Sequence, residues 1–283
     1  MQRITEKVGR AFSSAEPPAT ACAIRMSGRA SVTSLMLYPM PILGATAPVT
    51  PAGAAVVNNT EILAAITAVQ LACPGAKIIH AGGPTALFMR TGAYFANVPE
   101  ALMLRAAQAQ MAQYYGMPAG LGWGGTKAKQ PEAQSAYENT LGMVLELSAG
   151  ADFLFGAGLL DSVQQMSLEE LVIADEVFGM VTRLVRGVTV DEEHLAVDLI
   201  KRMGFKGDYL FDRHTRAHMR ELWQARLGET GTYDGWKAAG SPRLEDKARA
   251  VADCILATPA PGFPEEVSRE FTEIIAAAES GRI

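Results

Sequence analysis

Cysteine and histidine are scarce in this sequence, and their positions exclude the common disulfide and metal patterns. The chain has 283 residues but only three cysteines and four histidines. Cys22, Cys73 and Cys254 lie far apart and form no Cys-x-x-Cys pair, which argues against a zinc ribbon, a redox motif and a disulfide framework. We therefore predict that this chain holds no metal ion and works in a reducing compartment, the cytoplasm.

The sequence also lacks a concentration of charge and long apolar runs. Lys and Arg number 25 against 30 Asp and Glu, giving a net charge of -5, and the basic residues are scattered. Binding of a polyanion needs a basic patch, so nucleic acid is excluded as a partner. Polar residues or glycine interrupt each apolar run before the roughly 18 residues that a spanning helix needs, so we expect no membrane association.

Motifs of the common nucleotide-binding and hydrolytic enzymes are missing. Gly124–Lys127 reads Gly-Gly-Thr-Lys, which lacks the leading glycine and the spacing of a phosphate-binding loop. The chain has no Gly-x-Ser-x-Gly elbow, and no Gly-x-Gly-x-x-Gly follows a predicted strand. Nucleotide-binding, dinucleotide-binding and serine-hydrolase functions therefore lose their usual support.

Two of the four histidines have a spacing that deserves comparison with metal sites. His214 and His218 lie one helical turn apart, but the carboxylate of the zinc-protease motif does not stand between them. We interpret them as structural or surface residues, and His194, in a highly charged first helical turn, as solvated. His80 ends a predicted strand and faces either the mouth of a barrel or the packed helices, so it is a candidate pocket residue.

Short apolar strands alternate with longer helices from Leu35 onward, a pattern typical of parallel β/α units. The expected strands are Leu35–Met40, Lys77–His80, Pro118–Trp123 and Ala151–Phe155. Helices are expected near 51–73, 99–115, 131–150 and 167–186, the last opened by a capping box of Ser167 and Glu170. The fold class is thus α/β.

The pattern predicts three regions. Residues 1–34 have no clear apolar period and form a poorly ordered or atypical segment, and 35–190 carry about four β/α units. Residues 191–283 show only helical signals, near 192–203, 215–227, 243–256 and 265–280. Four units cannot close an eight-stranded barrel, so we expect part of a (β/α)8 TIM barrel with a helical C-terminal extension, and self-association through its unpaired edges.

The loops after the strands are unusually rich in glycine. In β/α barrels the reacting groups sit in these loops, and glycine leaves little bulk there. The loop glycines form a predicted rim that a large planar ligand or another protein could approach, although a tight turn alone would explain any one of them equally well. The rim residues are Gly82, Gly83, Gly124, Gly125 and Gly158.

Five further side chains are candidates for binding a substrate. Trp123 and Phe155 end predicted strands, where aromatic faces can hold a quaternary ammonium ion, although core packing is the alternative for each ring. Arg90 could bind a carboxylate with its planar guanidinium, or pair with a surface acid. Gln134 and Glu138 lie one helical turn apart and point back toward the preceding loop, where they orient a ligand or cap the helix. We predict that Arg90, Trp123 and Phe155 converge on one cavity.

Four ordered segments of the chain together resemble the trimethylamine methyltransferase family. They are Pro39-Met40-Pro41 with Gly44-Ala45-Thr46-Ala47-Pro48-Val49-Thr50, then Met89-Arg90-Thr91-Gly92-Ala93, Pro131-Glu132-Ala133-Gln134-Ser135-Ala136-Tyr137-Glu138, and Leu168-Glu169-Glu170-Leu171-Val172-Ile173-Ala174-Asp175-Glu176. The similarity runs from about Leu35 to the end of the chain and corresponds to the C-terminal half of the family's longer proteins.

The resemblance implies an activity and a partner. Family members are (β/α)8 barrels that pass a methyl group from a small methylated amine to the Co(I) of a separate, cognate corrinoid protein, so this chain is expected to bind no cofactor itself. The trimethylamine enzymes carry pyrrolysine, which is absent here, and the chain therefore looks closer to the branch acting on quaternary amines such as glycine betaine. Many relatives have a histidine pair where this chain has Phe155-Gly156.

The chemistry of a quaternary amine needs little from the protein. Such an amine leaves as a neutral tertiary amine, so the protein has only to hold the methyl group in line with its acceptor. The resemblance covers only the C-terminal half of the family's proteins, which leaves one alternative that is not an enzyme. In this alternative the chain is a truncated, catalytically inactive family member that serves as a binding or assembly module.

Overall fold

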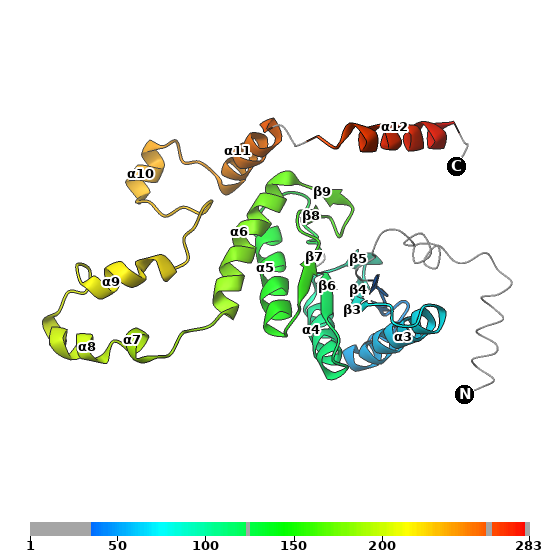
Figure 1. The fold of residues 1–283 in the computed structure, drawn as a ribbon, viewed down its shortest axis with the longest axis horizontal. Helices are drawn as coiled ribbons and strands as arrows, with labels where there is room; N and C mark the ends of the chain where they lie inside the picture. Colours follow the sequence, from blue (N-terminus) through cyan, green and yellow to red (C-terminus); the bar gives the residue numbers. More distant parts are fainter. Residues whose placement is uncertain (1–34, 123–124, 259–261, 281–283) are drawn as a thin grey trace.

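The computed structural model describes residues 35–122, 125–258 and 262–280, which form a mixed α/β structure around a parallel sheet (Figure 1). The four-stranded sheet has the order β1-β3-β6-β7, and every neighbouring pair is parallel. Its strands are β1 (Leu35–Leu37), β3 (Ile78–Gly82), β6 (Ala119–Gly122) and β7 (Phe153–Phe155). The four predicted strands, their order and their direction are therefore confirmed. The expected N-terminal segment 1–34 lies outside the described residues.

Four helices alternate with these strands and pack together along one face of the sheet. They are α3 (Pro51–Ala72), α4 (Pro99–Tyr114), α5 (Ala133–Ser148) and α6 (Leu168–Val185). Proline in the first turn opens α3 and α4, where a missing backbone N–H costs nothing. Ser167 caps α6 by accepting a hydrogen bond from Glu170 N at 3.1 Å. The predicted capping box is only half formed, because the Glu170 carboxylate is buried and bonds to Ser135 and Asn139 of α5 instead.

The apolar core lies between the sheet and these helices. Small side chains of α4 let it approach β6 closely, where Ala109 and Ala112 pack on Ala119 and Leu121. Met143 of α5 contacts α6 in a second cluster. The opposite face of the sheet is not covered by a described helix, and its apolar side chains remain partly exposed: Met36 is 37% and Phe153 is 50% exposed.

Two small sheets interrupt segments that the sequence pattern left as loops. Strand β2 (Ile42–Leu43) pairs parallel with β4 (Thr85–Phe88), which pairs antiparallel with β5 (Ala93–Phe95). Gly92 supplies the positive φ of 68° that the turn between β4 and β5 requires. The two-residue strands β8 (Leu159–Leu160) and β9 (Gln165–Met166) form a second antiparallel pair. The short length of these strands explains why no apolar alternation marked them.

Helices alone follow Asp191 in the described part of the chain. They are α7 (Glu192–Leu195), α8 (Val197–Met203), α9 (Arg213–His218), α10 (Tyr233–Ala238), α11 (Leu244–Ala257) and α12 (Glu265–Glu279), with 3-10 turns at Gly204–Lys206 and Met219–Glu221. Of these six helices, α11 packs extensively on α6, whereas α7, α8 and α9 form an arm that extends away from the sheet (Figure 1).

Two of the helices expected in this region are shorter than predicted. The expected helix 192–203 breaks at Ala196, whose φ of 47° is left-handed. The helix expected at 215–227 ends as α9 at His218, and after the 3-10 turn the chain becomes extended at Leu222.

Helix α3 contradicts the expectation that no segment is long and apolar enough to cross a membrane. By length and composition alone its 22 residues pass that test. The helix packs against α4 and β3, with Ala54, Ile62 and Val69 buried. One side of the helix therefore covers part of the sheet, and 22% of its apolar window is buried.

We predict that the uncovered face of the sheet makes the chain self-associate. Phe153 is half exposed there, and β1 and β7 are edge strands with unpaired backbone groups. A Phe153→Ser variant should weaken the dimer about tenfold, roughly 1.4 kcal/mol, because it removes an apolar contact from the interface. Sedimentation equilibrium over a hundredfold concentration range measures this.

The control is Val188→Ser, which changes an apolar side chain that is 85% exposed in the segment after α6. A wild-type chain that stays monomeric across the whole range would overturn the prediction.

Candidate functional site

Two aromatic rings lie side by side at the carboxyl ends of the parallel strands, on the uncovered face of the sheet. Tyr38 follows β1, and its ring meets the ring of Phe155 at the end of β7 edge to face, with centroids 5.0 Å apart and planes at 65°. Phe153 stacks on Phe155 at 5.9 Å. The three rings form an aromatic patch at the edge of the sheet where β/α proteins carry their active sites.

Two glycines make room for the Tyr38 ring. A Cβ added to Gly83 or to Gly122 would lie 2.4 Å from Tyr38 Oη, a distance that no real side chain tolerates. Burial raises the pKa of Tyr38 well above its ordinary value, so the phenol stays neutral. The strand-end glycines therefore position a neutral, partly buried aromatic ring.

Behind the end of β6, a buried arginine ties the strands to the helices. Arg105 of α4 donates hydrogen bonds to the carbonyl oxygens of Gly122 at 2.6 Å and Ala96 at 3.2 Å, and to Asn97 Oδ1 at 2.7 Å. Its Nε lies 2.9 Å from Glu146 Oε1 of α5, and both side chains are almost fully buried. One guanidinium thus holds the end of β6, the end of β5 and the face of α5.

Glu146 has an unusual protonation equilibrium for this reason. Burial raises its pKa from the ordinary 4.5 to about 7, and the positive charge of Arg105 opposes that rise only in part. The carboxyl is therefore poised to take up a proton near neutral pH.

The helix after β6 points two polar residues at the preceding loop, as the sequence predicted. Glu138 is buried and accepts hydrogen bonds from Thr126 Oγ1 at 2.5 Å and Lys127 N at 2.9 Å. Gln134 donates to the other carboxylate oxygen of Glu138 at 2.8 Å. In the structure this pair organises the loop, and its role in orienting a ligand stays a prediction.

A cavity of about 480 Å³ lies beside this loop, with Met40 and Tyr94 in its lining. Lys127 and Asp161 also line it, and the Asp161 carboxylate binds both Lys129 and Lys127, which lower its pKa. Asp161, Ser162 and Val163, which are consecutive, have left-handed φ values of 47°, 52° and 75°. Such strain in residues other than glycine is typical of functional loops.

Arg90 and Phe155 do not share the cavity in which they were predicted to converge. Arg90 is exposed near the β4–β5 turn and lines a separate cavity of about 680 Å³ with Phe88, Met89 and Glu100. The reason is the unpredicted small sheet, which carries Arg90 away from the strand ends. Trp123, the third member, lies outside the described residues.

His80 lies on the helix side of the sheet and not at the barrel mouth. It is fully buried, neither ring nitrogen has a hydrogen-bond partner, and its ring lies 6.0 Å from that of Tyr115 beyond α4. Burial lowers its pKa, so the imidazole stays neutral. Between the two orientations left open by the sequence, the structure selects the packed helices.

At each described rim glycine, neighbouring atoms of the chain occupy the space that a side chain would need. An added Cβ would meet Gln108 and Asn58 at Gly82, Leu159 at Gly125, and Ser167 O with Leu171 at Gly158. Close packing and positive φ values therefore already require these glycines. Gly124 lies outside the described residues, and an approach of another molecule to this rim stays a prediction.

Three residues of the site were missed by the sequence analysis. Tyr38 directly follows the first strand, a position that could have identified it together with the other strand-end aromatics. Arg105 and Glu146 occupy helical positions that look like ordinary charged surface residues. Only the tertiary packing of α4 against α5 shows that they are buried together.

Comparison with known proteins identifies the family. The sequence profile described as Trimethylamine methyltransferase (MTTB) matches residues 19–281. The chain belongs to the trimethylamine methyltransferase family. It is 34% identical over 253 residues to the trimethylamine methyltransferase MttB of Desulfitobacterium hafniense, which covers 89% of this chain and 51% of that protein.

Two other relatives extend the comparison. The MttB of Methanosarcina barkeri is 32% identical, covering 83% of this chain and 48% of its own length. A glycine betaine methyltransferase of D. hafniense is 33% identical, covering 77% and 46% respectively. The chain thus spans about half the length of the curated relatives it matches.

We predict that Glu146 makes the stability of this family member depend on pH. Between about pH 4.5 and 7 the folded protein holds a proton that the unfolded chain releases. The stabilising contribution is therefore complete below the unfolded pKa and is lost as the pH rises through about 7. From pH 5 to 8 this group should reduce the free energy of unfolding by roughly 1–3 kcal/mol.

Urea denaturation at four pH values checks this in wild type and Glu146→Gln. In the variant, the fall in the free energy of unfolding between pH 5 and 8 should be smaller by the contribution of Glu146. Other titrating groups such as His80 affect both proteins alike. Glu61→Gln, on the exposed side of α3, is the control and should keep the full fall. Parallel pH profiles for wild type and Glu146→Gln would show that Glu146 has no raised pKa.

Proposed function

We propose that this chain binds the methyl donor in a methyltransferase that moves a methyl group from a quaternary amine to the cobalt of a partner corrinoid protein. The observation that carries the proposal is the Tyr38–Phe155 ring pair at the carboxyl ends of the parallel strands, in a chain of this family. The relatives named for trimethylamine and glycine betaine support a methylated amine as substrate.

The ring pair suits a cation that cannot donate hydrogen bonds. A quaternary ammonium ion is attracted by the faces of aromatic rings, with about 0.5–2 kcal/mol per well-placed ring. The raised pKa of Tyr38 keeps its phenol neutral, so the ring would attract the cation through its aromatic face. Holding the donor in place is the main contribution expected of the protein, because the amine leaves without protonation.

The fold proposed for the active protein is a (β/α)8 barrel. Residues 35–190 supply four parallel strands with helices on one face, and the other face carries the ring pair and exposed apolar side chains. In a closed barrel that face is the interior. Residues 191–283 form the proposed helical region beside the barrel.

The corrinoid in this proposal belongs to the partner protein. At the described rim glycines, the space that an added Cβ would take is already occupied by Tyr38, Gln108, Leu159 and Leu171, so the proposal assigns no corrin-binding role to this chain itself. The reaction is proposed to take place in the cytoplasm, whose reducing conditions suit a Co(I) acceptor.

Ligand binding tests the donor site directly. We expect tetramethylammonium, choline and glycine betaine to raise the melting temperature of the chain and to give measurable dissociation constants by calorimetry. The neutral isostere of choline, 3,3-dimethylbutan-1-ol, should give neither. Tyr38→Leu and Phe155→Leu should each weaken cation binding about tenfold, since each removes one ring, roughly 1.4 kcal/mol.

Phe178→Leu, at an exposed position of α6, is the matched control and should bind like wild type. Equal affinity for choline and its isostere, or unchanged binding in both ring variants, would refute the donor site.

The exposed sheet face favours a second candidate function, a binding or assembly module without catalysis. Apolar residues such as Met36 and Phe153 are exposed on it, as expected of a surface that meets another protein. Incubation with glycine betaine and free cob(I)alamin separates the two functions. Formation of methylcobalamin supports the methyltransferase, and amine binding without methyl transfer supports the module.

A further inference from the structure

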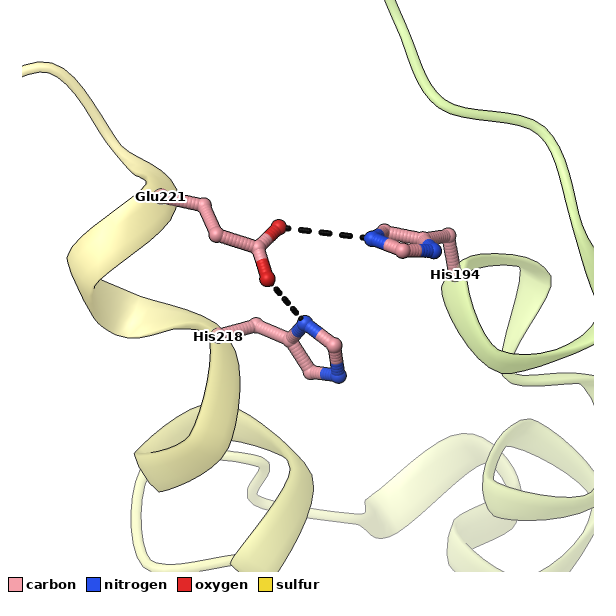
Figure 2. Close-up of side chains that lie close together, drawn as sticks. All are labelled: His194, His218 and Glu221. Atoms are coloured by element: carbon pink, nitrogen blue, oxygen red, sulfur yellow. Dashed lines mark hydrogen bonds and ion pairs between the residues drawn. The ribbon is translucent and has the colours of Figure 1, made fainter.

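Three of the four histidines gather with carboxylates in the arm formed by α7, α8 and α9, far from the aromatic patch (Figure 1). Figure 2 shows His194 of α7 facing His218 of α9, with Glu221 of the following 3-10 turn between them. The sequence analysis predicted no metal ligands here, because it interpreted His194 as solvated and found no carboxylate between His214 and His218. The fold of the arm brings them together.

The distances in this cluster match a small coordination sphere. His194 Nε2 lies 3.4 Å from one Glu221 oxygen, and His218 Nδ1 lies 2.5 Å from the other. One ligand atom from each of the three residues falls within 4.8 Å of the others. Ligand atoms bound tetrahedrally to zinc at about 2.0–2.1 Å are themselves roughly 3.3 Å apart, so only small side-chain movements are needed.

Each imidazole also has a carboxylate at its second nitrogen. His194 Nδ1 lies 2.7 Å from Asp191 Oδ1, and His218 Nε2 lies 3.4 Å from Glu193 Oε1. Metal-bound histidines almost always donate their other N–H to such a group, which fixes the tautomer and aims the free nitrogen at the metal. This arrangement orients both free nitrogens toward Glu221.

Local structure holds the ligands in place. Asp191 caps α7 by accepting from His194 N at 2.8 Å, so the same carboxylate positions the backbone and the ring of His194. Asp212 caps α9 and is joined to α8 by Arg202 at 2.6 Å. The cluster thus links α7 to α9 in an arm that has no buried core of its own.

We propose that His194, His218 and Glu221 bind one divalent transition-metal ion of the zinc class, with water in the remaining position. Two imidazoles and one carboxylate are ligands that zinc prefers, and Asp191 and Glu193 add the negative charge that attracts a cation. The ion cross-links α7 with α9 and stabilises the arm. This site is independent of the amine-binding function proposed above.

Metal titration of the whole chain tests the site. After treatment with a chelator and dialysis, the chain should take up one Zn²⁺, measured by elemental analysis. Co²⁺ in its place should give the intense visible absorption of a four-coordinate site. His194→Ala and His218→Ala should each weaken binding at least about a hundredfold, and Asp191→Asn, which can still cap α7, about tenfold to a hundredfold.

His214→Ala is the matched control, because its ring lies 4.3 Å from that of His218 but outside the three ligands. It should bind metal within about threefold of wild type. Circular dichroism of the metal-free variants confirms that each is folded like the metal-free wild type. A wild-type dissociation constant for Zn²⁺ above about 1 mM would overturn the proposal. Undiminished Zn²⁺ uptake by the His194→Ala, His218→Ala double variant would do the same.

Discussion

The buried ion pair of Arg105 and Glu146 is the interaction on which the candidate active site depends. A charged guanidinium inside an apolar layer is costly unless it is paired. Here two carbonyl oxygens and Asn97 accept hydrogen bonds from its terminal nitrogens, and the Glu146 carboxylate supplies the opposing charge. These contacts join α4, α5, β6 and the end of the small sheet. The carboxyl end of β6 is consequently fixed, and with it the glycine against which Tyr38 packs.

A chain of polar contacts extends this support toward the last helix of the β/α part. Asn97 donates to Asn139 Oδ1, Asn139 donates to Glu170, and Ser135 donates to the other oxygen of Glu170. Because Asn97 also accepts a hydrogen bond from Arg105 of α4, these contacts join α4, α5 and α6 by hydrogen bonds as well as by apolar contacts. Buried polar networks that are satisfied in this way favour one arrangement of the helices, since any other would leave polar groups unpaired.

The aromatic patch and the histidine cluster contrast in how they are supported. Tyr38 and Phe155 stand on a sheet whose other face is a packed core, so their positions follow from the strands. His194, His218 and Glu221 belong to an arm with little apolar packing, where helix caps and charge pairs set the geometry. Such an arm gains more from a cross-linking ion than a packed sheet would.

The sequence by itself determined the four parallel strands, the helices between them and the family, because apolar periodicity, prolines at helix starts and ordered motifs are local signals. It also predicted that Gln134 and Glu138 face the loop after β6, since one helical turn separates them. Only the tertiary structure decided which face His80 occupies, that Arg90 is carried away on a small sheet, and that Arg105 and Glu146 are buried together. The same holds for His194 and His218, because contacts between residues distant in sequence depend on how helices and strands pack, and no local pattern records that packing.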